Sequence, residues 1–210
     1  MMNKNLAGCG LGIMLAVFPM TGDAWATSGV IPEITIPAGD KLPVIDGNLG
    51  DAVWRQAAVI TNFDFIMRGR DEDRVAGHKA LVMHDDAWLY VGFDVKHPRP
   101  EFIQPKYLKR DERVQAEDCV KVTFDPGTDG KHWYHFRLSS ANIQSDQEST
   151  PRGIDKGNWN FLWPSVTRKT ATGWQAELAI PLAPLIKDAD LSKARLNLMI
   201  NSMIPVVDKQ

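Results

Sequence analysis

The feature that most constrains the fold of this chain is a stretch of alternating apolar and polar residues between positions 117 and 140. Val120 and Val122 share one face of the first run, and Phe136 and Leu138 share one face of the second. A period of two is typical of a β-strand with one buried face. The two runs are separated by the turn-forming sequence Pro126-Gly127-Thr128-Asp129-Gly130. The stretch therefore predicts an antiparallel hairpin whose apolar face packs on a core.

Further runs along the chain predict additional strands. The clearest hairpin covers residues 78–84 and 88–95, and another covers residues 165–169 and 174–180. Single strands are expected at Ile34 and Ile36, over 59–66 and over 195–204, with a short helix capped by Asp51 and a mobile loop over 141–156. About eight strands at hairpin spacing predict an all-β fold, an antiparallel β-sandwich of jelly-roll or immunoglobulin-like type with one or two short helices.

The composition is that of an ordinary globular chain. Of the 210 residues, 44% are hydrophobic and 24% are charged, and the formal net charge is −2. This is enough chain for one domain with a core of its own. The sequence has no basic stripe of the kind that nucleic acid requires, so nucleic acid is excluded as a partner.

The first 26 residues have the pattern of a secretory signal peptide. Lys4 supplies a positive start, residues 11–18 supply an apolar run, and Ala24-Trp25-Ala26 supplies a cleavage site of small residues. Cleavage after Ala26 would leave a domain of residues 27–210, secreted or periplasmic, with Cys119 as its one thiol. No later segment has the length of apolar sequence that a stable membrane span needs.

Five motifs in this sequence, taken in order, resemble those of the family 9 carbohydrate-binding modules and the wider group of sugar- and haem-binding sandwiches around them. They are Ile45-Asp46-Gly47-x-Leu49-x-Asp51-x-x-Trp54, Asp85-Asp86-x-x-Leu89-Tyr90-Val91, Glu117-Asp118-x-Val120-x-Val122-x-Phe124-Asp125, Phe136-Arg137-Leu138 and Gly173-Trp174-x-x-Glu177-x-x-Ile180-Pro181. They span nearly all of residues 27–210. The resemblance implies a sandwich that binds carbohydrate without catalysis, in a protein linked to polysaccharide breakdown or uptake. The sequence stops shortly after its last predicted strand, which leaves open that the natural protein continues and that this domain lacks its C-terminal segment.

The resemblance also implies a ligand site, in which two tryptophans clamp a terminal sugar while arginine, glutamate, glutamine and asparagine bind its hydroxyls. Arg137 matches the arginine of this site and Asn201 matches the asparagine. The departures are Gln115 at the first clamp tryptophan, Lys121 at the glutamate, Met199 at the glutamine, and no second clamp tryptophan before Gln210. A lysine in place of a carboxylate leads to the hypothesis that the ligand is an acidic sugar such as a uronate.

Other aromatic residues are candidates to replace the missing clamp. A pyranose has an apolar face that stacks on aromatic rings and a rim of hydroxyls that needs polar partners. The expected ligand-binding residues are therefore Arg137, Asn201, Lys121, Gln115, Trp133, Trp159 and Trp163. Trp54, Trp88 and Trp174 match structural positions of the motifs and are expected in the core.

No catalytic or metal site is predicted. Glycoside hydrolysis needs two carboxylates across the scissile bond, and the spacing of the available residues identifies no such pair among Glu117, Asp118, Asp125 and Glu177. Asp118 is expected to be a structural turn or sheet partner, and Glu177 an outward strand residue. A glycoside hydrolase or lyase in the same polypeptide or pathway stays open. His132 and His135 are at an odd offset on a strand, which separates them to opposite faces. Asp125 and Asp129 are weak candidates for calcium in the turn.

Two alternatives to carbohydrate binding remain. The resemblance extends to sandwiches that hold haem b non-covalently for electron transfer, and here the candidate ligands would be Met83, Met199, His84 and Lys121. The other alternative is a structural module of a larger secreted protein.

Overall fold

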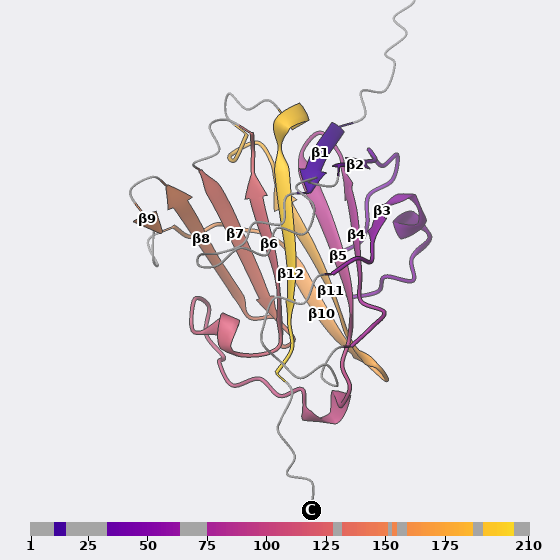
Figure 1. The fold of residues 1–210 in the computed structure, drawn as a ribbon, viewed down its shortest axis with the longest axis vertical. Helices are drawn as coiled ribbons and strands as arrows, with labels where there is room; N and C mark the ends of the chain where they lie inside the picture. The colour runs from indigo at the N-terminus through magenta and orange to yellow at the C-terminus, as the bar shows by residue number, and fades with distance from the viewer. Residues whose placement is uncertain are drawn as a thin grey trace, which may run out of the picture.

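Two β-sheets pack face to face in a computed structural model of the protein (Figure 1). The structure describes residues 11–15, 33–63, 75–127, 132–150, 153–154, 159–186 and 191–203. Sheet A has seven strands in the order β2-β1-β12-β6-β7-β8-β9, and sheet B has five in the order β10-β11-β5-β4-β3. All pairs are antiparallel except β1 with β12, which is parallel.

The elements have the following bounds. Sheet A contains β1 (Leu11–Leu15), β2 (Glu33–Ile36), β6 (Cys119–Asp125), β7 (Trp133–Ser139), β8 (Gln144–Thr150), β9 (Gly153–Ile154) and β12 (Arg195–Asn201). Sheet B contains β3 (Ala58–Ile60), β4 (Lys79–His84), β5 (Trp88–Lys96), β10 (Ser165–Thr170) and β11 (Gly173–Pro181). The helical elements are short 3-10 turns: η1 (Ala52–Gln56), η3 (Pro100–Phe102), η4 (Val114–Ala116) and η5 (Leu191–Lys193).

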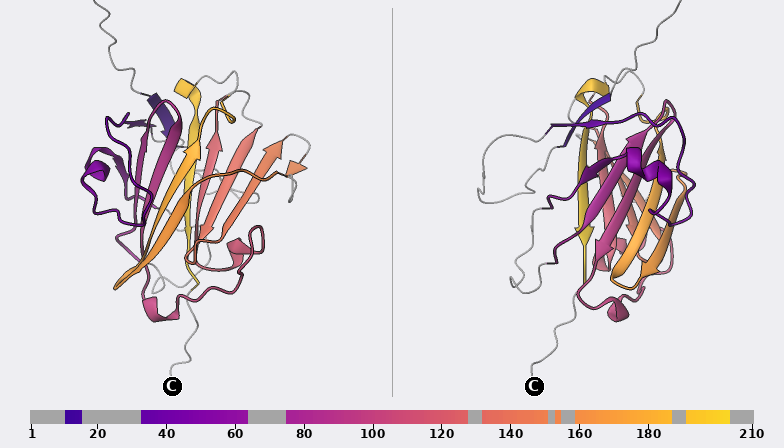
Figure 2. Two further views of the ribbon diagram at one scale, coloured as in Figure 1. Left: turned by 180° about the vertical axis from the view of Figure 1, so that it is seen from behind. Right: turned by 90° about the vertical axis from the view of Figure 1, so that its right-hand side faces the viewer.

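This architecture confirms the predicted antiparallel sandwich. The hairpin expected over residues 117–140 is β6 paired with β7, and Val122 lies directly opposite Phe136. Both side chains are fully buried between the sheets. The expected short helices are 3-10 turns, and no α-helix occurs in the described ranges. Figure 2 shows the two layers from behind and from one side.

The core lies between the sheets and follows the alternation of the strands. Trp174, Leu178 and Ile180 of β11 face Val122 and Phe136 of sheet A in one continuous cluster. Burying an aliphatic or aromatic side chain of this size stabilises the fold by roughly 1.5–3 kcal/mol. This face of sheet A is therefore occupied by packing, and only its opposite face is available for binding.

A second, smaller cluster covers the outer face of sheet B. It consists of Trp54, Ala57, Met83, Tyr90 and Ala179. Gly92 lies in β5 beneath this layer, where an added Cβ would come within 2.5 Å of Leu49 Cδ2. The segment that includes η1 thus covers the part of the outer face of sheet B around Tyr90 and Gly92.

The structure differs from the sequence expectations in four places. Residues 144–150 form β8 instead of a mobile loop, because their polar side chains are held by partners from other segments. The strand expected over 59–66 ends at Ile60, and residues 64–66 lie outside the described ranges. Asp51 makes no capping hydrogen bond with its side chain and instead accepts one from Asn48 Nδ2.

The fourth difference concerns Glu177, for which an outward strand position was expected. Its side chain does leave the main core, but it is 0% exposed beneath the segment at Gly47. Burial of this carboxylate was not apparent from the sequence because the covering residues are more than 100 positions away in the chain.

Residues 11–15 of the expected signal peptide form β1, whose backbone pairs with β2 and β12. The other residues of the expected signal peptide, including Ala24 and Ala26, lie outside the described ranges. Cleavage after Ala26 stays a prediction. In the described part of the chain, no helix has the length and hydrophobicity that crossing a membrane requires.

Candidate functional site

The outer face of sheet A carries a band of polar side chains across four neighbouring strands, β12, β6, β7 and β8, which lie side by side in Figure 1. Side chains directly opposite each other on paired strands point to the same face. One row across the band is Met199, Lys121, Arg137 and Ser145, and the next row is Asn197, Thr123, His135 and Gln147. The strand period that buries Val122 and Phe136 therefore turns these residues away from the core.

Lys121 and Arg137 lie at the centre of this band, opposite each other on β6 and β7. Lys121 is 8% exposed and Arg137 is half-buried. Burial and, second, the charge of Arg137 lower the pKa of the Lys121 ammonium to about 8. Burial likewise lowers the pKa of the Arg137 guanidinium. The arrangement concentrates positive charge in a poorly solvated position.

His135 joins β6, β7 and β8 through two hydrogen bonds. Its Nδ1 lies 3.1 Å from Thr123 Oγ1, and its Nε2 lies 2.8 Å from Ser149 Oγ. Burial, with the charges of Lys121 and Arg137, lowers the pKa of His135 to about 3. The imidazole is therefore neutral near pH 7, so one ring nitrogen donates and the other accepts.

Gln147 and Trp133 complete the polar band. Arg137 Nη1 donates to Gln147 Oε1 at 2.8 Å, which orients the guanidinium. Trp133 begins β7 on the same face as His135 and Arg137, and its ring is half-buried. Four residues along a strand span about 13 Å, so Trp133 lies within about two sugar units of Arg137.

Asn201 and Gln115 lie at one end of the band. Asn201 Nδ2 donates to Glu117 O at 2.8 Å and to Gln115 O at 3.3 Å. The Asn201 amide nitrogen therefore fastens β12 to the loop before β6. Gln115 is exposed on η4 beside it.

The two other predicted stacking residues, Trp159 and Trp163, lie on the opposite side of sheet A. Both rings pack edge-on against Phe136, with centroid distances of 5.9 and 5.6 Å, and Phe136 belongs to the main core. Trp159 also stacks on Phe161 at 5.1 Å. Trp163 is 3% exposed. The structure therefore brings Trp133, but neither of these tryptophans, together with Arg137.

Trp54 and Trp174 are buried, as expected of core residues, and Trp88 is half-buried against the second cluster.

The carboxylates considered for catalysis have structural partners. Glu117 Oε2 accepts from the Lys106 and Tyr107 backbone amides at 2.7 and 3.2 Å. Asp118 Oδ1 accepts from Met203 N at 3.0 Å. Glu177 accepts three hydrogen bonds beneath η1, on the far side of sheet B.

The candidate metal and haem ligands are dispersed. Asp125 is buried, with Oδ1 accepting from Gly127 N, and Asp129 lies outside the described ranges. Met83 and His84 belong to β4 of sheet B, whereas Met199 lies opposite Lys121 in sheet A. Within the described residues, no three or more His, Cys, Asp or Glu side chains group as metal ligands would.

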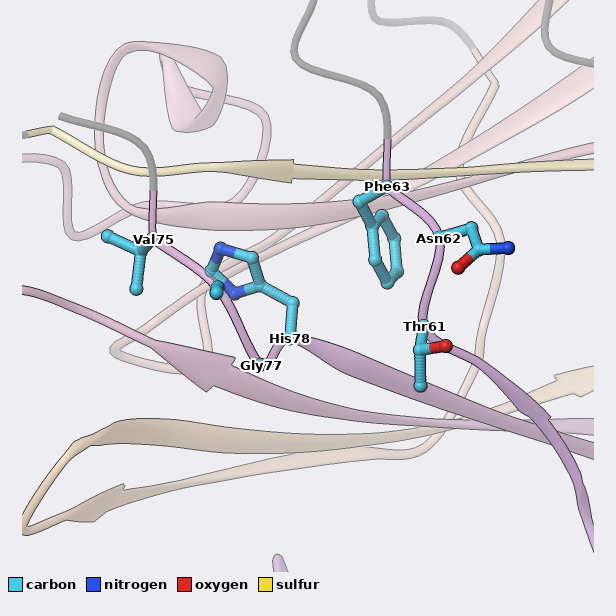
Figure 3. A pocket seen from close by; sticks show the side chains of 7 residues that line it. Thr61, Asn62, Phe63, Val75, Gly77 and His78 are labelled. Carbon is cyan, nitrogen blue, oxygen red and sulfur yellow. The ribbon is translucent and has the colours of Figure 1, made fainter. Parts of the chain in front are cut away.

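A separate hollow of about 550 Å³ lies where the chain leaves β3 and enters β4. Figure 3 shows the side chains of Phe63 and His78 next to each other there, between Val75 and Asn62. Their rings meet edge to face at 6.2 Å, and His78 Nδ1 accepts from Lys96 N. Burial is the first cause that lowers the pKa of His78. Among the described residues that line this hollow, His78 is the one titratable group, and its Nδ1 is already hydrogen-bonded. The hollow therefore offers a ligand fewer polar groups than the band on sheet A.

Sequence reasoning missed the contribution of β8, which supplies Ser145, Gln147 and Ser149 to the band. The available signal was their period of two, with small or amide side chains at every second position. It is weak because the alternate residues, Gln144 and Asp146, are also polar.

Comparison with known proteins gives one family and several related folds. The model of the "Carbohydrate family 9 binding domain-like" family matches residues 45–204. Two solved structures of a family 9 carbohydrate-binding module from Caldicellulosiruptor kristjanssonii, one in complex with cellotriose and one with glucose, each superpose with a TM-score of 0.50 at 20% identity. Each match covers 70% of this chain, and 67% and 69% of the respective module. No curated protein matches the sequence. The family model accounts for more than half of the residues, and the chain therefore belongs to the carbohydrate family 9 binding domain-like family.

Proposed function

We propose that the domain binds carbohydrate without catalysis on the outer face of sheet A. The observation that carries the proposal is the band across β12, β6, β7 and β8, with Arg137 at its centre and Trp133 at one end. On the outer face of sheet B, the cluster around Trp54 covers the part that includes Met83, Tyr90 and Ala179.

The band has the two kinds of group that a sugar requires. Half-buried Trp133 supplies an aromatic ring on which the apolar face of a pyranose stacks. Arg137 has donors beyond the one bonded to Gln147, and charged donors form the stronger hydrogen bonds to hydroxyl oxygens. Because Gln147 fixes the guanidinium before binding, less side-chain entropy is lost on association.

Membership of the family supports the same reading. Its modules are non-catalytic, and the two matched structures hold cellotriose and glucose. At 20% identity these structures support the fold and not a particular sugar for this chain. We also propose that the protein takes part in polysaccharide breakdown or uptake and that residues 1–26 direct its export.

The test is binding of the purified protein to a glycan array, followed by calorimetry with the best ligand. Arg137→Ala is expected to weaken binding at least tenfold, because a charged hydrogen bond contributes roughly 1.5–3 kcal/mol. Arg168→Ala is the matched control, since Arg168 is exposed on β10 in sheet B. Equal affinity of the two variants, with both folded, would contradict binding at this face.

A further inference from the structure

Two cations lie directly opposite each other at the centre of the band. Lys121 of β6 and Arg137 of β7 are a cross-strand pair on the outer face of sheet A. Like charges in this position repel and destabilise a sheet, and burial strengthens the repulsion because fewer water dipoles screen it. Such a pair is expected to persist where an anion offsets the repulsion.

The described surroundings do not supply this anion. The flanking members of the same row, Met199 and Ser145, are uncharged. Asp146 of β8 lies opposite Phe136 and thus on the core side of the sheet. Among the described residues, neither Lys121 nor Arg137 forms an ion pair.

The carboxylates at the two ends of β6 already have other partners. Asp125 shares the outer face, but it lies four residues from Lys121, about 13 Å along the strand. Its Oδ1 accepts from Gly127 N. Glu117, four residues away in the other direction, accepts from the Lys106 and Tyr107 amides. The positive charges of Lys121 and Arg137 are therefore available to a ligand that binds this face.

We propose that the ligand is an acidic saccharide, a uronate or uronate-containing oligosaccharide, whose carboxylate binds between Lys121 and Arg137. This inference rests on the proposed function and specifies its ligand class. Arg137 makes one described hydrogen bond, to Gln147, which leaves guanidinium N–H groups for one carboxylate oxygen. The Lys121 ammonium donates to the other, and the pyranose ring extends along β7 toward Trp133.

The experiment compares sugars that differ only in the carboxylate. Titration calorimetry of the protein would use glucose against glucuronate, galactose against galacturonate, and the corresponding oligosaccharides, with acetate as the free anion. Tighter binding of the uronate by about tenfold or more is expected, as is a decrease in this preference between 50 and 500 mM salt.

Charge-removing variants then locate the effect. Lys121→Met removes the charge and keeps an unbranched apolar chain, and the matched control is Lys79→Met, an exposed lysine on β4 of sheet B. The ratio of uronate to neutral-sugar affinity should fall toward one in Lys121→Met and stay at the wild-type value in the control. Circular dichroism and a thermal melt establish that each variant is folded.

The outcomes separate this inference from the proposed function. Equal affinity for neutral and acidic sugars overturns the inference and leaves carbohydrate binding intact. Affinity for acetate equal to that for glucuronate overturns carbohydrate binding and leaves an anion site. A uronate preference that survives Lys121→Met overturns the assignment to this lysine, and no binding of any probe overturns both proposals.

Discussion

At the scale of single residues, the unusual feature is the set of ionisable groups on the outer face of sheet A. His135 is neutral near pH 7 because burial and two neighbouring cations lower its pKa to about 3. Burial is the main cause that raises the pKa of the Cys119 thiol to about 12, so this cysteine is an inert thiol at neutral pH. Lys121, with a pKa of about 8, is the member of this described set whose charge changes near neutrality.

This pKa leads to a pH dependence of uronate binding. A bound carboxylate raises the pKa of Lys121, so binding favours the protonated ammonium. Affinity for glucuronate should therefore be constant from pH 6 to about 7 and fall above about pH 8, by at most tenfold per pH unit. Calorimetry across pH 6–9 measures this change.

The other groups that face Lys121 are expected to keep their charge over this range. Arg137 remains a cation, while His135 and the Cys119 thiol stay neutral. Lys121→Met should thus abolish the fall above pH 8. A pH profile that is the same in wild type and Lys121→Met would assign the titration to a different group.

At the scale of elements, Glu177 of β11 connects sheet B to the segment that covers its outer face. Its Oε2 accepts from the backbone amides of Asp46 and Gly47 at 2.8 and 2.6 Å, and its Oε1 accepts from Trp54 Nε1 at 2.7 Å. Gly47 has φ +83°, a conformation that favours glycine and that turns its amide toward the carboxylate. One buried side chain thereby satisfies three donors of a segment that has little regular structure.

Removing this carboxylate should destabilise the whole domain. Glu177→Ala leaves three donors without their acceptor, and each unsatisfied buried donor costs about 1–3 kcal/mol, so a loss of about 3 kcal/mol or more is expected. Urea denaturation followed by tryptophan fluorescence gives the free energy of unfolding.

The control for this change is Gln175→Ala, on the same face of β11 two residues away. Gln175 is half-buried, and a loss below about 1 kcal/mol is expected there. A Glu177→Ala variant as stable as Gln175→Ala would show that the segment around η1 is held by its apolar contacts alone.

At the scale of the whole molecule, the two outer faces of the sandwich carry different side chains. Part of the face of sheet B is covered by Trp54 and its neighbours, whereas the face of sheet A presents the band around Arg137. Residues of the expected signal peptide take part in sheet A, because β1 lies between β2 and β12. Independently of β1, Ile36 of β2 is fully buried, and the backbone of Pro37 and Gly39 bonds to His84 of β4.

We predict that residues 1–26 are removed when the protein is exported. Expression in a Gram-negative host should yield periplasmic protein that begins at Thr27, as measured by intact mass and N-terminal sequencing. Replacing Ala24 and Ala26 by leucine should block cleavage, because the site needs small residues at both positions. Protein recovered with residues 1–26 attached from the wild-type gene would contradict the signal peptide and keep β1 in the sheet.

The sequence by itself determined the sandwich and its main core. Strand alternation needs no partner to be recognised, so Val122 and Phe136 could be assigned to the core from local pattern alone. Trp174 was assigned there because it matches a structural position of the motifs. The same alternation turned Lys121 and Arg137 to one face, and the motifs drew attention to both.

The tertiary structure decided everything that depends on which segments meet. It assigned Trp163 to the core and Trp133 to the band, since a tryptophan has the same local signature in either place. It made a strand of the polar residues 144–150, whose Gln144 and Asp146 are satisfied by Trp163 and by Arg110. Long-range polar contacts of this kind produce no periodic pattern in a sequence, because the hydrogen-bond partner of each residue is distant in the chain and comes near only in the folded protein.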